Sequence, residues 1–282
     1  MLGLETALKT AFSNLSCFSS LTELELKFQS FNRPLELNNG ATSYSELPRV
    51  HIEQQLISQF TSHPIPPGIT SFRLKNLTPI PNTFLSFNHF QNLMHSIKKL
   101  EITYISASFE GNSSNGFWLC NVCKDMLRAA TSITHLSLGT RNGVDIDDDG
   151  HSAHVPPYDT IACDDIYFQH LTHLTFNGVV FGLDVATEGF ILRHKETLTH
   201  LTLQNCMVYD ETNRWANVWR DLEVEMISLI SLKVSHYLSD EGVSLDYISA
   251  FGEVFSGISE LDDYEDDIAF ADLEIAVDRR RT

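Results

Sequence analysis

The stretch LTHLTLQNC, residues 198–206, places leucine at its first, fourth and sixth positions, with other residues between them. Two further segments, ITHLSL at 133–138 and LTHLTF at 171–176, share its Thr-His-Leu-Ser/Thr centre. Over the last positions of each segment apolar and polar residues alternate, which is typical of a short strand with one buried face. The stretch therefore predicts a strand that occurs more than once.

The same pattern, apolar-x-x-apolar-x-apolar, recurs along most of the chain. Copies begin at residues 21, 69, 97, 133, 171, 198 and 229, so successive copies start 48, 28, 36, 38, 27 and 31 residues apart. Most copies follow a stretch with helical spacing. This spacing is clearest in residues 215–227, whose predicted buried face consists of Trp215, Val218, Trp219 and Leu222. The repeating unit is thus predicted to be a helix, a turn and a short strand.

A single unit of this size cannot bury its own apolar face, so such units become stable by stacking. Stacking places the strands in one parallel sheet with the helices on its other side, and we expect the wider helices to make the strand side concave. We therefore predict an α/β solenoid of about seven repeats over residues 1–257, with an acidic insert near residues 140–160. Residues 258–282 are predicted to form an acidic tail or a helix that caps the last repeat through Ile268, Phe270, Leu273 and Val277.

The repeated segments resemble the core of leucine-rich repeats, Leu-x-x-Leu-x-Leu-x-x-Asn/Cys, and residues 198–206 also carry cysteine, Cys206, at the final position. Over about residues 1–240 the chain is similar to the irregular, long-repeat branch of this family, in particular to the repeat regions of fungal F-box-type proteins. The resemblance implies an interaction module that binds a partner protein through its concave face. As an alternative, it implies the substrate-recognition part of an F-box-type ubiquitin-ligase adaptor, which has ligase scaffold subunits as partners. No stretch fits the F-box module, and the first repeat begins almost at Met1. Two interpretations stay open: the sequence is truncated, or the protein binds its partner without being a ligase adaptor.

Side chains between the apolar positions of each strand are predicted to point to the concave face. The early strands then offer charged groups, and the later strands offer imidazoles and hydroxyls. Three histidines occupy one column on neighbouring strands, which leaves three interpretations open: a polar stack, a patch that titrates near about pH 6.5, or a metal site. The candidate partner-binding residues are Arg73, Lys75, Lys99, Glu101, His135, His173, Thr175, Asn177, His200, Thr202, Gln204 and Lys233.

The segment DIDDDGHSAH, residues 145–154, matches the first half of an EF-hand loop. Its oxygen ligands and glycine at positions 1, 3, 5 and 6 are Asp145, Asp147, Asp149 and Gly150. Position 12, where such a loop needs a bidentate glutamate, is Pro156. The segment is therefore interpreted as a flexible acidic insert, and weak calcium binding or a metal-dependent function centred on its Asp and His residues remain the alternatives.

Catalytic motifs are missing from the sequence. It contains no Gly-x-Ser-x-Gly elbow, no Gly-rich phosphate loop and no His-Glu-x-x-His. Cys120 and Cys123 have a zinc-like spacing, but they fall in a predicted helix and are interpreted as buried thiols. We therefore expect a protein that is not an enzyme and that holds no metal and no cofactor.

The net charge of −18 is unevenly distributed along the chain. Residues 1–100 hold eight Lys/Arg against six Asp/Glu, a sum of +2, whereas residues 101–282 hold eleven against thirty-one, a sum of −20. Such a field repels phosphate backbones and anionic lipid, so neither nucleic acid nor membrane is an expected partner. The odd count of five cysteines and the lack of a signal-peptide pattern favour an intracellular protein, cytoplasmic or nuclear.

Overall fold

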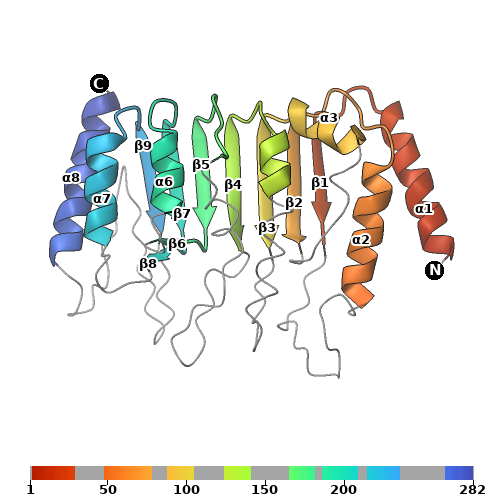
Figure 1. The fold of residues 1–282 in the computed structure, drawn as a ribbon, viewed down its shortest axis with the longest axis horizontal. Helices are drawn as coiled ribbons and strands as arrows, with labels where there is room; N and C mark the ends of the chain where they lie inside the picture. Colours follow the sequence, from red (N-terminus) through yellow and green to blue (C-terminus); the bar gives the residue numbers. More distant parts are fainter. Residues whose placement is uncertain are drawn as a thin grey trace.

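The computed structural model describes residues 2–28, 48–77, 88–104, 124–140, 165–181, 186–208, 215–235 and 264–281. Within these ranges, one parallel sheet of seven strands runs through the molecule (Figure 1). Its strands are β1 (Glu23–Lys27), β2 (Ser71–Leu77), β3 (Lys99–Tyr104), β4 (His135–Thr140), β5 (His173–Asn177), β7 (His200–Gln204) and β9 (Ser231–Ser235). The strand order is β1-β2-β3-β4-β5-β7-β9, so each strand of this sheet pairs with the one before it and the one after it in the chain. The fold class is therefore α/β, and the order is compatible with a solenoid.

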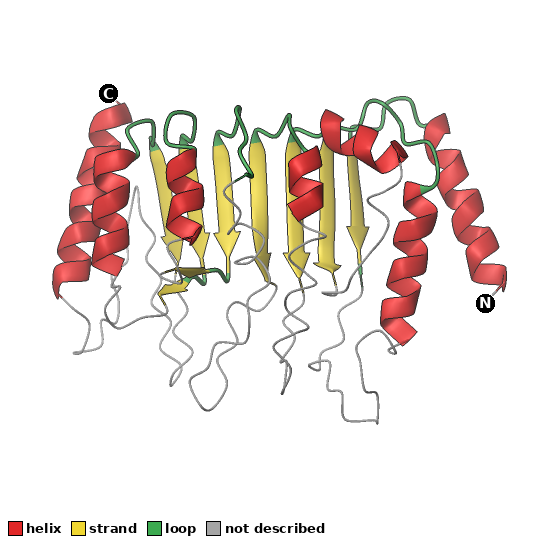
Figure 2. Cartoon of the chain, viewed as in Figure 1, coloured by secondary structure: helices red, strands yellow, loops and turns green. Residues whose placement is uncertain are grey.

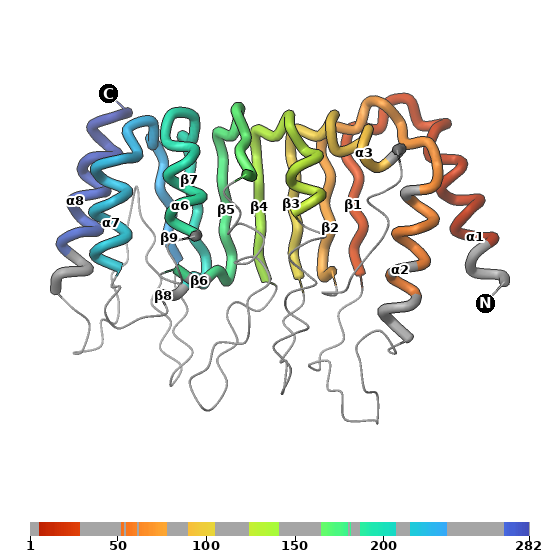
Figure 3. Tube along the Cα trace, in the orientation of Figure 1, coloured from red at the N-terminus to blue at the C-terminus, as the bar shows by residue number. Residues whose placement is uncertain are grey.

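Helices lie together on one side of this sheet (Figure 2). They are α1 (Leu2–Ser13), the 3-10 helix η1 (Asn14–Cys17), α2 (Pro48–Thr61), α3 (Asn88–Ser96), α6 (Ala186–Arg193), α7 (Trp215–Glu225) and α8 (Tyr264–Arg281), and residues 124–129 are also helical. The tube trace in Figure 3 runs from α1 and α2 at one end of the sheet to α7 and α8 at the other. A short second sheet pairs β6 (Val180–Phe181) with β8 (Met207–Val208). No helix in the described ranges has the length and apolar character needed to cross a membrane.

The first, fourth and sixth positions of the repeated segments form the core, as predicted. Strand register aligns the fourth positions in one column, which consists of Leu24, Phe72, Leu100, Leu136, Leu174, Leu201 and Leu232. From Phe72 onward every member of this column is buried, whereas Leu24 on the edge strand β1 is half-buried. Burying one leucine side chain stabilises the fold by about 1.5–3 kcal/mol, so these columns carry much of the driving force for stacking.

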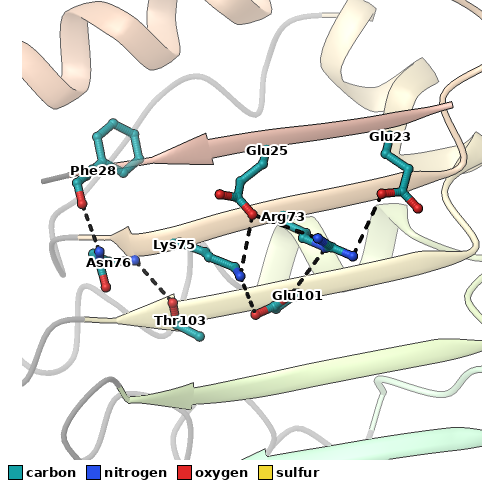
Figure 4. Close-up of polar contacts among 8 residues, drawn as sticks. All are labelled: Glu23, Glu25, Phe28, Arg73, Lys75, Asn76, Glu101 and Thr103. Carbon is teal, nitrogen blue, oxygen red and sulfur yellow. Dashed lines mark hydrogen bonds and ion pairs between the residues drawn. The ribbon is translucent and has the colours of Figure 1, made fainter. Parts of the chain in front are cut away.

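A left-handed residue lies at the same place in three of the repeats, within β2 and directly after β5 and β7. Asn76, Gly178 and Asn205 have φ of 59°, 66° and 50°, a conformation that glycine and asparagine adopt more readily than other residues. The Asn76 side-chain amide donates to the Phe28 carbonyl at 2.8 Å (Figure 4). The residue after each left-handed position is buried, namely Leu77, Val179 and Cys206. These are the residues at the final position of the repeat pattern, so the turn returns the chain to the core.

Helix α8 caps the last strand, but not through all of the predicted residues. Phe270, Leu273 and Val277 are buried as expected, and the Phe270 ring lies edge-on to Trp219 of α7 with centroids 5.2 Å apart. The prediction for Ile268 is wrong: its side chain is 44% exposed, and Ala269 is buried instead. Two residues along a helix correspond to a rotation of about 200° around its axis, so Ile268 and Phe270 lie on nearly opposite sides. Phe270 lies on the side that packs against α7, and Ile268 therefore points away from it.

The terminal arginines complete this cap, a role that the sequence analysis did not anticipate. Arg280 donates to the carbonyls of Met226 at 2.7 Å and Glu223 at 2.6 Å, and Arg281 donates to the carbonyl of Ile230. The Glu223 and Met226 carbonyls lie at the C-terminal end of α7, where a helix leaves carbonyls without intrahelical partners and where positive charge is favourable. The cap therefore satisfies backbone groups at the end of the repeat array.

Candidate interaction surface

The candidate partner-binding residues all lie on the seven-stranded sheet, at positions that alternate with the buried ones. Each of the twelve side chains is half-buried or exposed. We call the surface formed by these alternating positions of β1, β2, β3, β4, β5, β7 and β9 the strand face. The structure thus brings the predicted residues onto one surface, and their role in binding stays a prediction.

The first part of the strand face is a charged cluster, defined as Glu23, Glu25, Arg73, Lys75 and Glu101 (Figure 4). Arg73 on the middle strand lies 3.8, 3.9 and 3.5 Å from carboxylate oxygens of Glu23, Glu25 and Glu101. Lys75 lies 3.4 Å from Glu25 and 3.4 Å from Glu101. These side chains are 29% to 61% exposed, so each pair contributes at most about 1 kcal/mol. Arg73, Lys75 and Glu101 are therefore already paired within the sheet.

The second part is a histidine ladder, defined as His135, His173 and His200. The rings of His135 and His173 stack with centroids 4.0 Å apart and an interplanar angle of 11°. His173 and His200 stack in the same way, at 4.1 Å and 7°. Because the three strands are parallel and in register, identical residues at one position adopt the same arrangement. Of the three interpretations of this column, the structure displays the stack.

A threonine supports each imidazole of the ladder. Each hydroxyl lies 2.8–2.9 Å from the Nδ1 of the histidine that follows it and 3.0–3.1 Å from a carbonyl oxygen of the preceding repeat. The threonines are Thr134, Thr172 and Thr199. Because a carbonyl oxygen only accepts, the single hydroxyl proton is donated to it, and Nδ1–H of the ring donates to the hydroxyl oxygen. This arrangement leaves Nε2 as the nitrogen that can accept or take up a proton.

The ladder favours the uncharged form of its histidines. Burial, and then the neighbouring ladder histidines and Lys99, lower the pKa of His173 from 6.5 to about 4. Burial also lowers the pKa of His135, with Lys99 as the next cause, and that of His200, with Arg281 and Lys233 as the next causes. The ladder is therefore neutral at pH 7 and becomes positive only in acid.

Metal binding by the ladder has little geometric support. The stacked rings hold their nitrogens side by side, whereas a zinc site needs ligands that converge on one point. In the part of the chain that the structure describes, no group of three or more His, Cys, Asp or Glu side chains is arranged to hold a metal ion. The other metal-related residues, Asp145, Asp147, Asp149, Gly150, Cys120 and Cys123, lie outside the described residues.

Gly139 marks a close approach between β4 and β5 on the strand face. A Cβ atom at this position would lie 2.6 Å from the carbonyl oxygen and 2.7 Å from the Cβ of Asn177. Neither contact can relax easily, since one atom belongs to the backbone and the other is fixed to it. Glycine is therefore required here for the candidate residue Asn177 to keep its place beside β4.

His194 is a buried histidine that the sequence analysis did not single out. Its Nδ1–H donates to the Phe190 carbonyl at 2.7 Å, and its Nε2 accepts from the Phe168 amide at 3.0 Å. Burial lowers its pKa to about 4, so it stays neutral in the core. It connects α6 to the segment that enters β5, which is a structural role. The only sequence signal for it is its position four residues after Phe190, within the same helical stretch.

Comparisons with known proteins add no further evidence on the fold or the function of this chain. No protein-family model matches the sequence, and neither a curated protein nor a solved structure matches it. The fold class and the strand face therefore rest on the register, burial and contacts described above.

Proposed function

We propose that the chain is a leucine-rich-repeat solenoid that binds a partner protein through the strand face, the concave side of the array. The observation that carries this proposal is the register of the seven-stranded sheet, which lines up polar side chains in columns while helices lie on the other side. The left-handed turns at Asn76, Gly178 and Asn205 support the repeat assignment, because each occupies the same repeat position.

The dimensions of the strand face suit an elongated partner surface. Seven strands at a spacing of about 4.8 Å extend over about 29 Å, which matches about nine residues of extended chain. The surface is held by a buried core, so its side chains keep their spacing in the free protein. A rigid, half-buried polar surface loses little side-chain entropy on binding, and this favours recognition of a protein.

Affinity capture with identification by mass spectrometry tests the proposal. The variant is His173→Glu/His200→Glu, which places two carboxylates in the histidine ladder. The matched control is His95→Glu/His170→Glu, which adds the same charges at two exposed histidines outside the strand face. We expect a partner that the wild type and the control capture and the ladder variant loses. A partner retained by all three proteins would contradict the proposal, and ligase scaffold subunits among the lost partners would extend it to the adaptor role.

Thermal melts of both variants, followed by circular dichroism, accompany the capture. They separate a lost partner from a lost fold, because both variants are expected to melt close to the wild type at pH 7.5.

A further inference from the structure

The strand face differs in charge from the rest of the chain. Its alternating positions carry five cationic side chains, Lys27, Arg73, Lys75, Lys99 and Lys233, against three carboxylates, Glu23, Glu25 and Glu101. This is a sum of +2 on a chain whose net charge is −18, so everything else sums to −20. An acidic protein therefore presents a basic surface on its sheet.

The excess is concentrated around the histidine ladder. Lys99 on β3 precedes His135 in the same column, and Lys233 on β9 pairs in register with Thr202, two residues after His200. The positive charge of Arg281 on α8 also lowers the pKa of His200. The groups whose charges act on the three imidazoles are thus cations or other imidazoles.

Carboxylates on the adjoining elements β3 and α8 are already engaged. Glu101 on β3 pairs with Arg73 and Lys75 of the charged cluster. Asp278 on α8 accepts from Arg281 at 3.0 Å. Protonation of the ladder would therefore place up to three further positive charges between Lys99 and Lys233.

A group of cations held together by a rigid sheet is a binding site for the opposite charge. We propose that the histidine ladder with Lys99 and Lys233 binds the carboxylates of an acidic segment of the partner protein, and that binding strengthens as the ladder is protonated. The inference rests on the proposed function, since it names the partner chemistry of the same strand face. A segment that runs from Lys99 to Lys233 crosses four strand spacings, about 19 Å, or about six residues of extended chain.

The threonines make this proton uptake possible without rearrangement. In the neutral ring Nδ1–H already donates to the threonine hydroxyl, so the added proton goes to Nε2 and no hydrogen bond of the ladder is broken. A bound carboxylate then accepts from Nε2–H and offsets the repulsion between the stacked rings. Because the bound anion favours the protonated ladder, protons and anion bind cooperatively.

The charge of the remaining chain argues for a short acidic peptide over a nucleic acid. A long polyanion would extend past the strand face of a chain whose other residues sum to −20, whereas a segment of about six residues stays on the basic part. Partner carboxylates are therefore the better match.

Fluorescence anisotropy with a labelled hexa-aspartate peptide tests the inference at pH 7.5 and 5.5 and constant ionic strength. We expect the Kd to fall by about tenfold between the two values, as for one proton taken up over one pH unit. The variant His135→Gln/His173→Gln/His200→Gln should lose this pH dependence, and the control His170→Gln should keep it. Equal affinity at both pH values, or an unchanged pH dependence in the triple variant, would overturn the inference. Tighter binding of a single-stranded oligonucleotide of equal charge would overturn the choice of a protein partner.

A second measurement keeps the inference testable if the triple variant does not fold. In the wild-type protein, NMR titration of the ring nitrogens should show Nδ1–H tautomers at pH 7.5 and a higher pKa for the ladder histidines when the peptide is present. An unchanged pKa would count against the inference. The capture experiment separates the two proposals: a partner lost on His173→Glu/His200→Glu, together with a peptide that never binds, leaves the proposed function standing and removes only this inference.

Discussion

The charged cluster and the histidine ladder lie on the same sheet and in the same register. They avoid repulsion between neighbouring side chains in opposite ways. In the cluster, the column of Glu25, Arg73 and Glu101 alternates in charge, so its neighbours attract. Lys75 reaches Glu25 and Glu101 diagonally on the strands on either side. In the ladder, neighbours are identical, and repulsion is avoided because the rings stay neutral. The comparison teaches that repeat register makes a column either self-compensating in charge or dependent on the neutral form of its side chains.

Both regions depend on the same apolar columns beneath them, so a core substitution should affect them equally. Leu201 on β7 is 1% exposed, and Leu201→Asp buries an unpaired charge beside Leu174 and Leu232. We expect a loss of about 4 kcal/mol or more in the free energy of unfolding. Urea denaturation measures it, with the neighbouring strand-face substitution Thr202→Ala as the control. Similar losses in both variants would contradict the assignment of faces.

A methyl group at Gly139 tests whether the ladder strands need their close spacing. Gly139→Ala places a Cβ against the Asn177 backbone, and overpacking of this kind costs about 1–3 kcal/mol. Urea unfolding gives the cost, with Ser137→Ala two residues earlier on the same strand and face as the control. An alanine variant as stable as the wild type would mean that β4 and β5 are less closely packed than described.

Lowering the pH should reveal the contribution of the ladder to the free energy of unfolding. The folded pKa of His173, about 4, lies below its unfolded value of 6.5, so the unfolded state takes up the proton first. The contribution of the neutral His173 to the free energy of unfolding is complete above about pH 6.5 and is lost as the pH falls towards about 4. Because solvent screens this half-buried group, we expect a contribution on the order of 1 kcal/mol.

Unfolding free energies of wild type and His173→Gln at pH 7.5 and 5.0 measure this contribution. The wild type should lose more stability between the two pH values than the variant does. His194 titrates in both proteins and cancels in the difference. A steeper loss in the variant would contradict the sign.

The smallest effect is expected in the charged cluster. A double-mutant cycle with Lys75→Gln and Glu101→Gln should give a coupling below about 1 kcal/mol, because both side chains are partly solvated and the pair competes with other partners. The coupling should shrink further in 1 M salt, where the Debye length is about 3 Å. Chemical denaturation by urea gives the four free energies. A coupling of several kcal/mol that resists salt would show that the cluster is far less solvated than its exposure indicates.

The repeat pattern predicted the strands and their faces because local alternation of apolar residues fixes which side chains are buried. It also predicted the column of His135, His173 and His200, since equal positions in parallel strands become neighbours. The same rule brings Glu25 and Glu101 beside Arg73. The contact of Arg73 with Glu23 is diagonal and depends on side-chain conformation, which the repeat pattern does not fix.

The C-terminal helix α8 shows the same limit of prediction from sequence. Helical spacing predicted a buried stripe on α8 but misplaced Ile268, since a short apolar pattern fits two rotations of a helix and only the contact with Trp219 selects one. Arg280 and Arg281 gave no signal at all. Their partners are carbonyls about fifty residues earlier, and backbone acceptors leave no trace in a sequence.

The central claim, that the strand face is the binding surface, is tested most directly by the affinity of the captured partner, measured by calorimetry with purified proteins. We expect that His173→Glu/His200→Glu weakens binding by at least about tenfold, or 1.4 kcal/mol, while His95→Glu/His170→Glu binds like the wild type. Equal affinity for all three proteins, with their folds intact, would contradict it.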